Sequence, residues 1–207
     1  MVYKFDPAYW NGTTFRLDED AWEMARGWMK FEQDNQPIPA SYFPNSLTFD
    51  GASATLPDMF HTNRGIIVFS ERARVVMKEW ASGQVEFIPV AVQAAPEIAE
   101  RLNFATAYYF INVLGRAQRL LWLEMPTREF PRRDDGTESF GLIHDFDEWK
   151  LRERAAGEPL IWHDTAWRSG NRKYSGHDVI FVDDVLWREL DANFPDQLNA
   201  LRVGEQA

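Results

Sequence analysis

The segment Gly65–Val90, GIIVFSERARVVMKEWASGQVEFIPV, contains in quick succession a strand, a helix and a second strand. Its apolar run Ile66–Phe69 predicts a short buried strand. Ser70 follows directly and offers a side-chain oxygen to the free N–H groups at the start of a helix. Glu71 adds a negative charge in the first helical turn, where the helix dipole favours it. The segment therefore predicts a strand that runs straight into a capped helix.

The expected helix has one apolar face. Four of its residues recur at the i, i+3, i+4, i+7 spacing of such a face, namely Ala73, Val76, Met77 and Trp80. Ser82-Gly83 ends the helix because glycine readily adopts the backbone conformation that follows a helix C-terminus. The run Val85–Ile88 is rich in strand-forming residues, and we expect its strand to end at Pro89. This strand–helix–strand unit is the predicted scaffold of the fold.

A weaker version of the same pattern occurs at Val179–Val203, VIFVDDVLWRELDANFPDQLNALRV. Asp183 takes the capping place of Ser70, and an apolar stripe follows at Leu186, Leu190 and Phe194. Strand–helix units are common in proteins, and few residues are identical between the two segments. Two interpretations therefore stay open: an internal repeat, or two unrelated units that share a pattern.

The rest of the chain alternates between short strand-like and helix-like segments. Strands are expected at Val2–Phe5, Thr13–Leu17, Leu47–Phe49, Ala105–Val113, Gln118–Met125, Phe140–Phe146 and Leu160–Trp162. Helices are expected at Ala21–Phe31, Pro96–Arg101 and Asp147–Ala156. We expect the strands 105–113 and 118–125 to pair across a turn at Gly115. Strands outnumber crossover helices, so the sequence predicts an α+β fold with mixed or largely antiparallel sheets and several short packing helices.

Composition and charge narrow the classes of function. The chain has 207 residues, 45% of them apolar, which is enough to bury a substantial core. Its 32 acidic and 22 basic residues give a net charge of −10, which argues against a nucleic-acid-binding protein and is compatible with a basic protein partner. The other interpretation of the negative net charge is that it serves only to keep the protein soluble.

The location expected from the sequence is the cytoplasm. The chain has no cysteine, which excludes disulfides and thiolate metal sites. No apolar run approaches the ~20 residues of a membrane-spanning helix. The N-terminal residues MVYKFDPAYW lack the basic and then apolar layout of a signal peptide.

The sequence contains no catalytic motif. Three of the four histidines precede an acid, in the pairs His144-Asp145, His163-Asp164 and His177-Asp178, whereas His61 does not. Imidazole and carboxylate groups bind divalent metals, but these pairs lack a spacing that places two ligands on one face. Ser70 has no nucleophile-elbow sequence around it, and phosphate-binding glycine loops are absent. Paired carboxylates could carry out acid–base chemistry, and three acids lie in or beside expected strands: Glu86, Glu124 and Asp145.

We therefore expect no enzymatic activity, cofactor or metal. A metal-dependent hydrolase that uses the histidine and aspartate residues is the first alternative.

Several segments, taken in order, resemble the DUF1629 family, also grouped as Imm11-type immunity proteins. LPDMF at 56–60 precedes GIIVFSERARVVMKEW and VEFIPV, and YYFINVLGRAQRLLWLEM follows at 108–125. The segment Val179–Val203 is similar to the C-terminal strand, helix and closing strand of that family. The resemblance covers residues 55–203. We therefore expect a single globular unit, residues 1–207, with a variable N-terminal part at 1–54 and a family-like core at 55–203.

The resemblance implies that the protein binds and neutralises a cognate antibacterial toxin, by blocking the toxin's active site or its access to substrate. Nuclease toxins are frequent in such systems, and an acidic inhibitor can imitate their polyanionic substrate. The acidic stretches Asp134–Glu138 and Asp145–Glu148 are candidates for contact with a basic partner, although a solvated surface is the favoured explanation for each of them. No toxin-binding residue is assigned from the sequence. An adaptor domain with a non-toxin partner is the second alternative.

Overall fold

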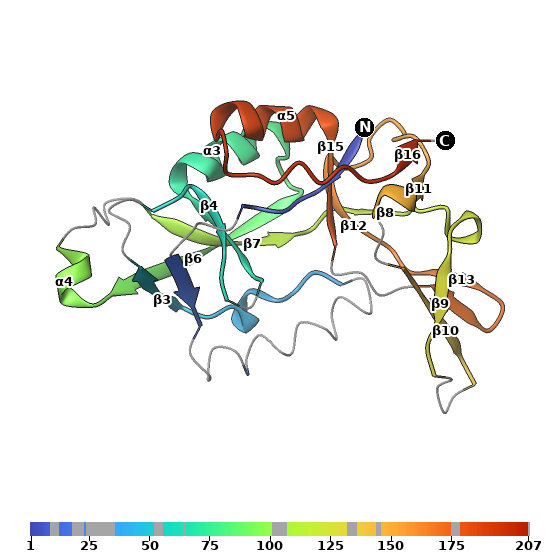
Figure 1. The fold of residues 1–207 in the computed structure, drawn as a ribbon, viewed down its shortest axis with the longest axis horizontal. Helices are drawn as coiled ribbons and strands as arrows, with labels where there is room; N and C mark the ends of the chain where they lie inside the picture. Colours follow the sequence, from blue (N-terminus) through green and yellow to red (C-terminus); the bar gives the residue numbers. More distant parts are fainter. Residues whose placement is uncertain are drawn as a thin grey trace.

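The computed structural model describes residues 1–8, 13–17, 23, 36–51, 56–63, 65–100, 107–131, 136–143, 146–174 and 179–206. Within these residues the fold is α+β, with short helices packed on mixed sheets (Figure 1). The predicted fold class is therefore confirmed. None of the helices in the described ranges is long and apolar enough to cross a membrane.

The largest sheet has six strands and contains the first unit identified in the sequence. Its strands, in spatial order, are β2 (Thr13–Arg16), β3 (Ser46–Gly51), β6 (Val85–Ala94), β7 (Tyr108–Val113), β5 (Ile67–Ser70) and β4 (Met59–His61). Only β3 and β6 pair in parallel, and the other neighbours are antiparallel. Two strands from the first 51 residues thus belong to this sheet.

Three smaller sheets complete the β structure. One has the order β1 (Val2–Lys4), β15 (Ile180–Asp183), β12 (Ile161–Asp164) and β8 (Arg116–Ala117). Another has the order β13 (Trp167–Ser169), β14 (Arg172–Tyr174), β10 (Glu138–Leu142) and β9 (Thr127–Glu129). The last pairs β11 (Lys150–Leu151) with β16 (Glu205–Gln206) in parallel. These sheets hold the segments that form the site described below.

The helices are short. The α-helices are α3 (Glu71–Trp80), α4 (Pro96–Ala99) and α5 (Asp184–Asn193), and the 3₁₀ helices are η1 (Ala40–Tyr42), η2 (Trp122–Glu124) and η3 (Phe146–Glu148). Both predicted caps are confirmed. Ser70 Oγ accepts a hydrogen bond from the Ala73 amide at 3.2 Å, and Asp183 Oδ1 accepts one from the Val185 amide at 3.3 Å.

The two strand–helix units meet in one core, because α3 and α5 lie side by side over the sheets (Figure 1). Met77 of α3 is fully buried there with Leu186, Leu190 and Phe194, the predicted stripe of α5. The prediction for Trp80 is wrong, since this side chain is 36% exposed. The chain turns back toward β6 after Trp80, and Ala81 takes the buried position instead.

Strand β6 does not end at Pro89 as predicted but continues to Ala94. The pairing explains why proline is tolerated. The Ala91 amide faces β3, where it donates to the Asn45 carbonyl, and the nitrogen of Pro89 faces the same side because backbone directions repeat every second residue. Strand β3 pairs with β6 only from Ala91 onward, so the missing N–H of Pro89 removes no hydrogen bond from the sheet.

The predicted pairing of 105–113 with 118–125 is also wrong. Strand β7 already has β5 on one side and β6 on the other, which leaves no edge for a third neighbour. The chain instead forms β8, which pairs with β12, and then the 3₁₀ turn η2. The apolar run Leu120–Leu123 is therefore irregular backbone and not a strand.

The expected helix at Asp147–Ala156 is absent. The short turn η3 ends at Glu148 and strand β11 follows, although Trp149 and Leu151 are buried as predicted. Strand β10 ends at Leu142, before the predicted end at Phe146. Strands β13 and β14 occupy a polar stretch for which no strand was predicted.

At the C-terminus, Arg202 forms an isolated bridge with Tyr3 in place of the closing strand expected from the family resemblance. The expected helix Ala21–Phe31 lies outside the described residues, except for Glu23.

Candidate binding site

A cavity of about 290 Å³ opens beside the turn η2, on the side of the molecule that carries β9, β10 and β13 in Figure 1. Its lining residues are Gln118, Leu120, Leu121, Trp122, Leu123, Glu124 and Trp167. All but two are aliphatic or aromatic, and Glu124 is the one charged side chain among them. The site is therefore a hollow whose lining side chains are mostly apolar, although polar atoms form about half of its surface, with a carboxylate beside it.

The lining combines buried and exposed apolar groups. Leu120 and Trp122 are buried, whereas Leu123 is 72% exposed. Aromatic packing supports the hollow from behind: the ring of Tyr174 lies 5.8 Å from Trp122 and 5.0 Å from Trp167, between centroids. Strand β14 thus holds the two tryptophans that line the cavity.

Backbone contacts hold the segment 118–124 on its inner side. The Leu121 amide donates to the Lys150 carbonyl at 3.0 Å, and Leu120 forms an isolated bridge with Leu151. Arg152 binds the same segment twice, through its amide to the Arg119 carbonyl at 2.9 Å and through Nε to the Gln118 carbonyl at 3.0 Å. The wall of the cavity is therefore fixed although it is not part of a regular strand.

Asp164 holds the segment from β12. Its Oδ2 accepts hydrogen bonds from the Arg119 amide at 2.7 Å and the Leu120 amide at 3.2 Å, and its Oδ1 is buried. Burial raises the pKa of Asp164 to about 7, and hydrogen bonds from the two amides and from the Trp162 side chain oppose this rise only in part. The carboxyl group is thus a positioning element that is poorly solvated when charged.

The side chain of Arg119 extends inward from the same segment and is 0% exposed. Its guanidinium carbon lies 4.5 Å from the centroid of the Trp162 ring, and its Nε donates to the Arg152 carbonyl at 3.2 Å. Asp183 Oδ2 lies 3.7 Å from Nη1, so this ion pair is long. Burial lowers the pKa of Arg119, and the charge of Asp183 opposes this change only in part.

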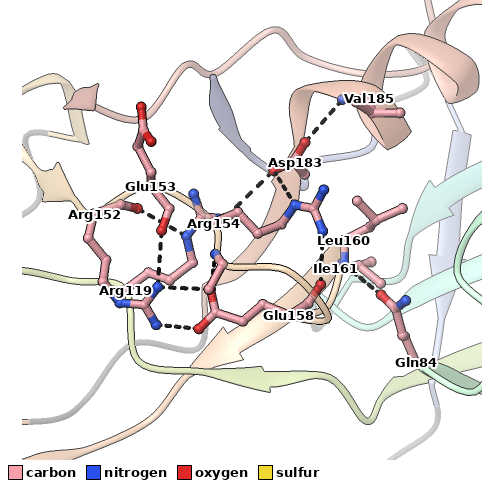
Figure 2. Close-up of polar contacts among 11 residues, drawn as sticks. Gln84, Arg119, Arg152, Glu153, Arg154, Glu158, Leu160, Ile161, Asp183 and Val185 are labelled. Atoms are coloured by element: carbon pink, nitrogen blue, oxygen red, sulfur yellow. Dashed lines mark hydrogen bonds and ion pairs between the residues drawn. The ribbon is translucent and has the colours of Figure 1, made fainter. Parts of the chain in front are cut away.

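Figure 2 shows how this cluster continues to α5 and β12. Arg154 Nε lies 3.4 Å from Asp183 Oδ2. Asp183, which caps α5, therefore also forms an ion pair with an arginine of the loop after β11. Arg152 forms a bidentate pair with Glu158, whose pKa falls to about 2 because of this arginine. Gln84 Oε1 accepts from the Leu160 and Ile161 amides at 2.6 and 3.2 Å. The cluster therefore connects the cavity wall to the rest of the fold.

The histidine–aspartate pairs do not form a catalytic group in the described part of the chain. His163 and Asp164 are consecutive in β12, so their side chains point to opposite faces of the sheet. Burial, followed by the nearby Arg116, lowers the pKa of His163 to about 3 and keeps the imidazole neutral. The other candidates, His144, Asp145, His177 and Asp178, lie outside the described residues.

His61 has an acid partner that the sequence did not predict. Its Nε2 lies 3.3 Å from Asp6 Oδ1, and its Nδ1 lies 3.2 Å from the Gly65 carbonyl oxygen. Asn199 donates to the other oxygen of Asp6 at 2.9 Å. Although burial opposes the change, the hydrogen bonds from His61 and Asn199 lower the pKa of Asp6 to about 2. The contacts join the N-terminal segment, β4 and the C-terminal segment, which is a structural role.

Ser70 is committed to structural contacts as well. Its hydroxyl donates to Asp58, and the same oxygen accepts from the Ala73 amide. Of the acids expected in or beside strands, Glu86 accepts from Asn112 Nδ2 at 2.9 Å and Glu124 lies at the cavity. No group of three or more histidine, cysteine, aspartate or glutamate side chains that could hold a metal is found among the residues that the structure describes.

The acidic stretches considered for partner contact are described only in part. Asp134, Asp135 and Asp145 lie outside the described residues. Glu138 pairs with Arg172 Nε at 3.2 Å, whereas Glu148 is exposed. Glu138 and Glu148, the acids of these stretches placed by the structure, are therefore not shown to form a site.

Sequence reasoning missed the cavity, the buried Arg119 and the role of Asp164. The signal available was the run Leu120–Leu123, because four consecutive apolar residues do not fit the alternation of a half-buried strand. No protein-family model and no curated protein matches this sequence.

Proposed function

We propose that this protein is an immunity protein that binds a cognate toxin in the cytoplasm and blocks its active site or its access to substrate. The observation that carries the proposal is the preformed cavity with mostly apolar lining side chains, among them the 72% exposed Leu123, on a protein of net charge −10. A hollow with an exposed apolar group beside it can receive an anchor side chain of a protein partner. The resemblance to immunity proteins of polymorphic toxin systems points to the same class of partner.

The size of the cavity is compatible with a protein partner. Sites for drug-sized molecules and cofactors usually measure roughly 300 to 1,000 Å³. At about 290 Å³ the cavity lies at the lower edge of this range and has room for one large side chain. Interfaces commonly obtain much of their affinity from such an anchor in a pocket.

The net charge of −10 supports a toxin with a basic surface, such as the substrate groove of a nuclease. Opposite charges accelerate association, and salt weakens this effect. The association rate constant with the toxin should therefore fall as salt rises, while the dissociation rate constant changes much less.

Co-expression with the toxin candidate encoded beside this gene tests the proposal. We expect growth to be rescued and the two proteins to elute together in size-exclusion chromatography. A toxin that still kills when this protein is abundant and folded, and that forms no complex with it, would refute the proposal.

A further inference from the structure

We infer that the cavity at Leu123, Glu124 and Trp167 receives a large apolar side chain flanked by a basic residue of the partner protein. The inference rests on the proposed function, and it adds the place and the chemistry of the contact. It follows from the mostly apolar lining side chains, from the carboxylate of Glu124 with its open ion pair to Lys150, and from the way the wall is held.

The apolar part of the lining selects the anchor. Trp167 lies partly exposed on β13 and lines the cavity together with Leu121 and Leu123. A phenylalanine or leucine side chain placed here would cover Leu123 and replace water at both walls. Burial of this surface drives association, and the effect is largest for aromatic and large aliphatic anchors.

Glu124 favours a basic residue next to the apolar side chain of the partner. Its side chain is 53% exposed and its carboxylate lies 3.6 Å from Lys150 Nζ, which is itself 48% exposed. An ion pair so open to solvent is weak, so a partner's lysine or arginine can join or replace Lys150 at little cost. A partner's carboxylate would instead be repelled by Glu124 and by the net charge of the whole protein.

The cavity wall is organised before binding. Asp164 and Arg152 fix the backbone of 118–120 from the interior, and the Lys150 carbonyl fixes Leu121. A partner therefore does not have to order this segment, and the entropic cost of binding is lower. This separates the cavity from a chance apolar surface on a loop that makes no inner contacts.

The test uses three synthetic peptides and the full-length protein labelled with ¹⁵N. The probes are acetyl-Lys-Phe-Lys-amide, its glutamate-flanked counterpart acetyl-Glu-Phe-Glu-amide, and acetyl-Lys-Ser-Lys-amide. Titrations followed by the indole N–H signals of Trp122 and Trp167 give the site and the affinity. We expect the lysine–phenylalanine peptide to shift these signals and to bind at least tenfold more tightly than either of the other peptides.

Variants separate the cavity from general attraction by charge. Leu123→Asp should weaken binding of the lysine–phenylalanine peptide at least tenfold. Val75→Asp, which introduces the same charge at a 53% exposed valine on α3, should not weaken it. Glu124→Gln should weaken binding of this peptide about threefold to fivefold, as expected for loss of a half-exposed ion pair. Glu79→Gln, at an exposed acid of α3, is the matched control and should change it less than twofold. Equal binding of the serine and phenylalanine peptides, or unmoved indole signals, would overturn the inference.

The same variants distinguish this inference from the proposed function. A neighbouring toxin that binds wild-type protein and Leu123→Asp equally well would refute the cavity as the docking site and leave the immunity function standing. Peptide binding at the cavity without any toxin binding would refute the immunity function alone. Loss of the toxin complex in Leu123→Asp but not in Val75→Asp would support both.

Discussion

Replacement of Asp164 by asparagine should remove a pH dependence of stability that the wild-type protein has. Burial raises the pKa of this carboxyl from 3.8 to about 7. Between these two values the folded protein retains a proton that the unfolded chain releases. Stability therefore falls as pH rises through this window, which is opposite to the usual effect of a salt-bridged aspartate.

The size of the stability change follows from the part of the Asp164 pKa shift that lies between pH 5 and pH 8, where the protein can be studied. About two pKa units of the shift lie between pH 5 and pH 7, and each unit corresponds to ~1.4 kcal/mol. Asp164 should therefore lower the free energy of unfolding by about 2 to 3 kcal/mol between pH 5 and pH 8. The asparagine side chain of the variant cannot ionise, yet its oxygen can still accept from the Arg119 and Leu120 amides.

The assay is urea denaturation followed by tryptophan fluorescence at pH 5 and pH 8 and constant ionic strength. The change in unfolding free energy between the two pH values should differ by about 2 to 3 kcal/mol between wild-type protein and Asp164→Asn. Asp50→Asn is the matched control, because its carboxylate is more than half exposed, beside Arg16. Parallel pH profiles of wild-type protein and Asp164→Asn would show that the carboxyl is not desolvated as the structure indicates.

Three further substitutions test the core and the caps. Ser70→Ala should lower the unfolding free energy by about 0.5–2 kcal/mol, because α3 loses its N-cap, whereas Ser82→Ala in the exposed turn should stay within about 0.5 kcal/mol. Phe194→Ala should cost about 3–5 kcal/mol by leaving a cavity between the helices, and Val185→Ala on the exposed side of α5 should cost less than about 1 kcal/mol. Both pairs are read out by urea denaturation, and equal effects within a pair would contradict the assigned burial or cap. Glu158→Gln should destabilise the protein by about 1 kcal/mol at pH 7. Because the pKa of Glu158 is lowered from 4.5 to about 2, this loss should fade as pH falls from 4.5 toward 2, and a loss that persists at pH 2 would exclude its pairing with Arg152 as the cause.

The local sequence was sufficient for the two strand–helix units. Ser70 and Asp183 cap their helices as predicted, because a cap depends on residues two or three positions away along the chain. The stripe of α5 was correct for the same reason, since helical spacing places these residues on one face whatever they pack against. Such features depend on contacts close in sequence.

Sheet neighbours were decided only by tertiary structure. The segment 118–125 has the composition of a strand, but both edges of β7 were taken by β5 and β6, so it formed an irregular wall. The helix expected at Asp147–Ala156 was lost to pairing of β11 with residues more than fifty positions later in the chain. Pairing of this kind depends on which edges remain open, and residue types alone do not reveal that.

The sequence by itself determined the α+β class, the absence of thiol chemistry, the acidic charge and both helix caps, because these depend on composition or on neighbours along the chain. Only the tertiary structure brought Asp164 to the amides of Arg119 and Leu120, 45 and 44 residues away in sequence, and brought Trp167 to the same cavity as Leu123. A side-chain cluster and a cavity are made by surfaces that meet after folding. The candidate binding site therefore became visible only with the packing of the sheets.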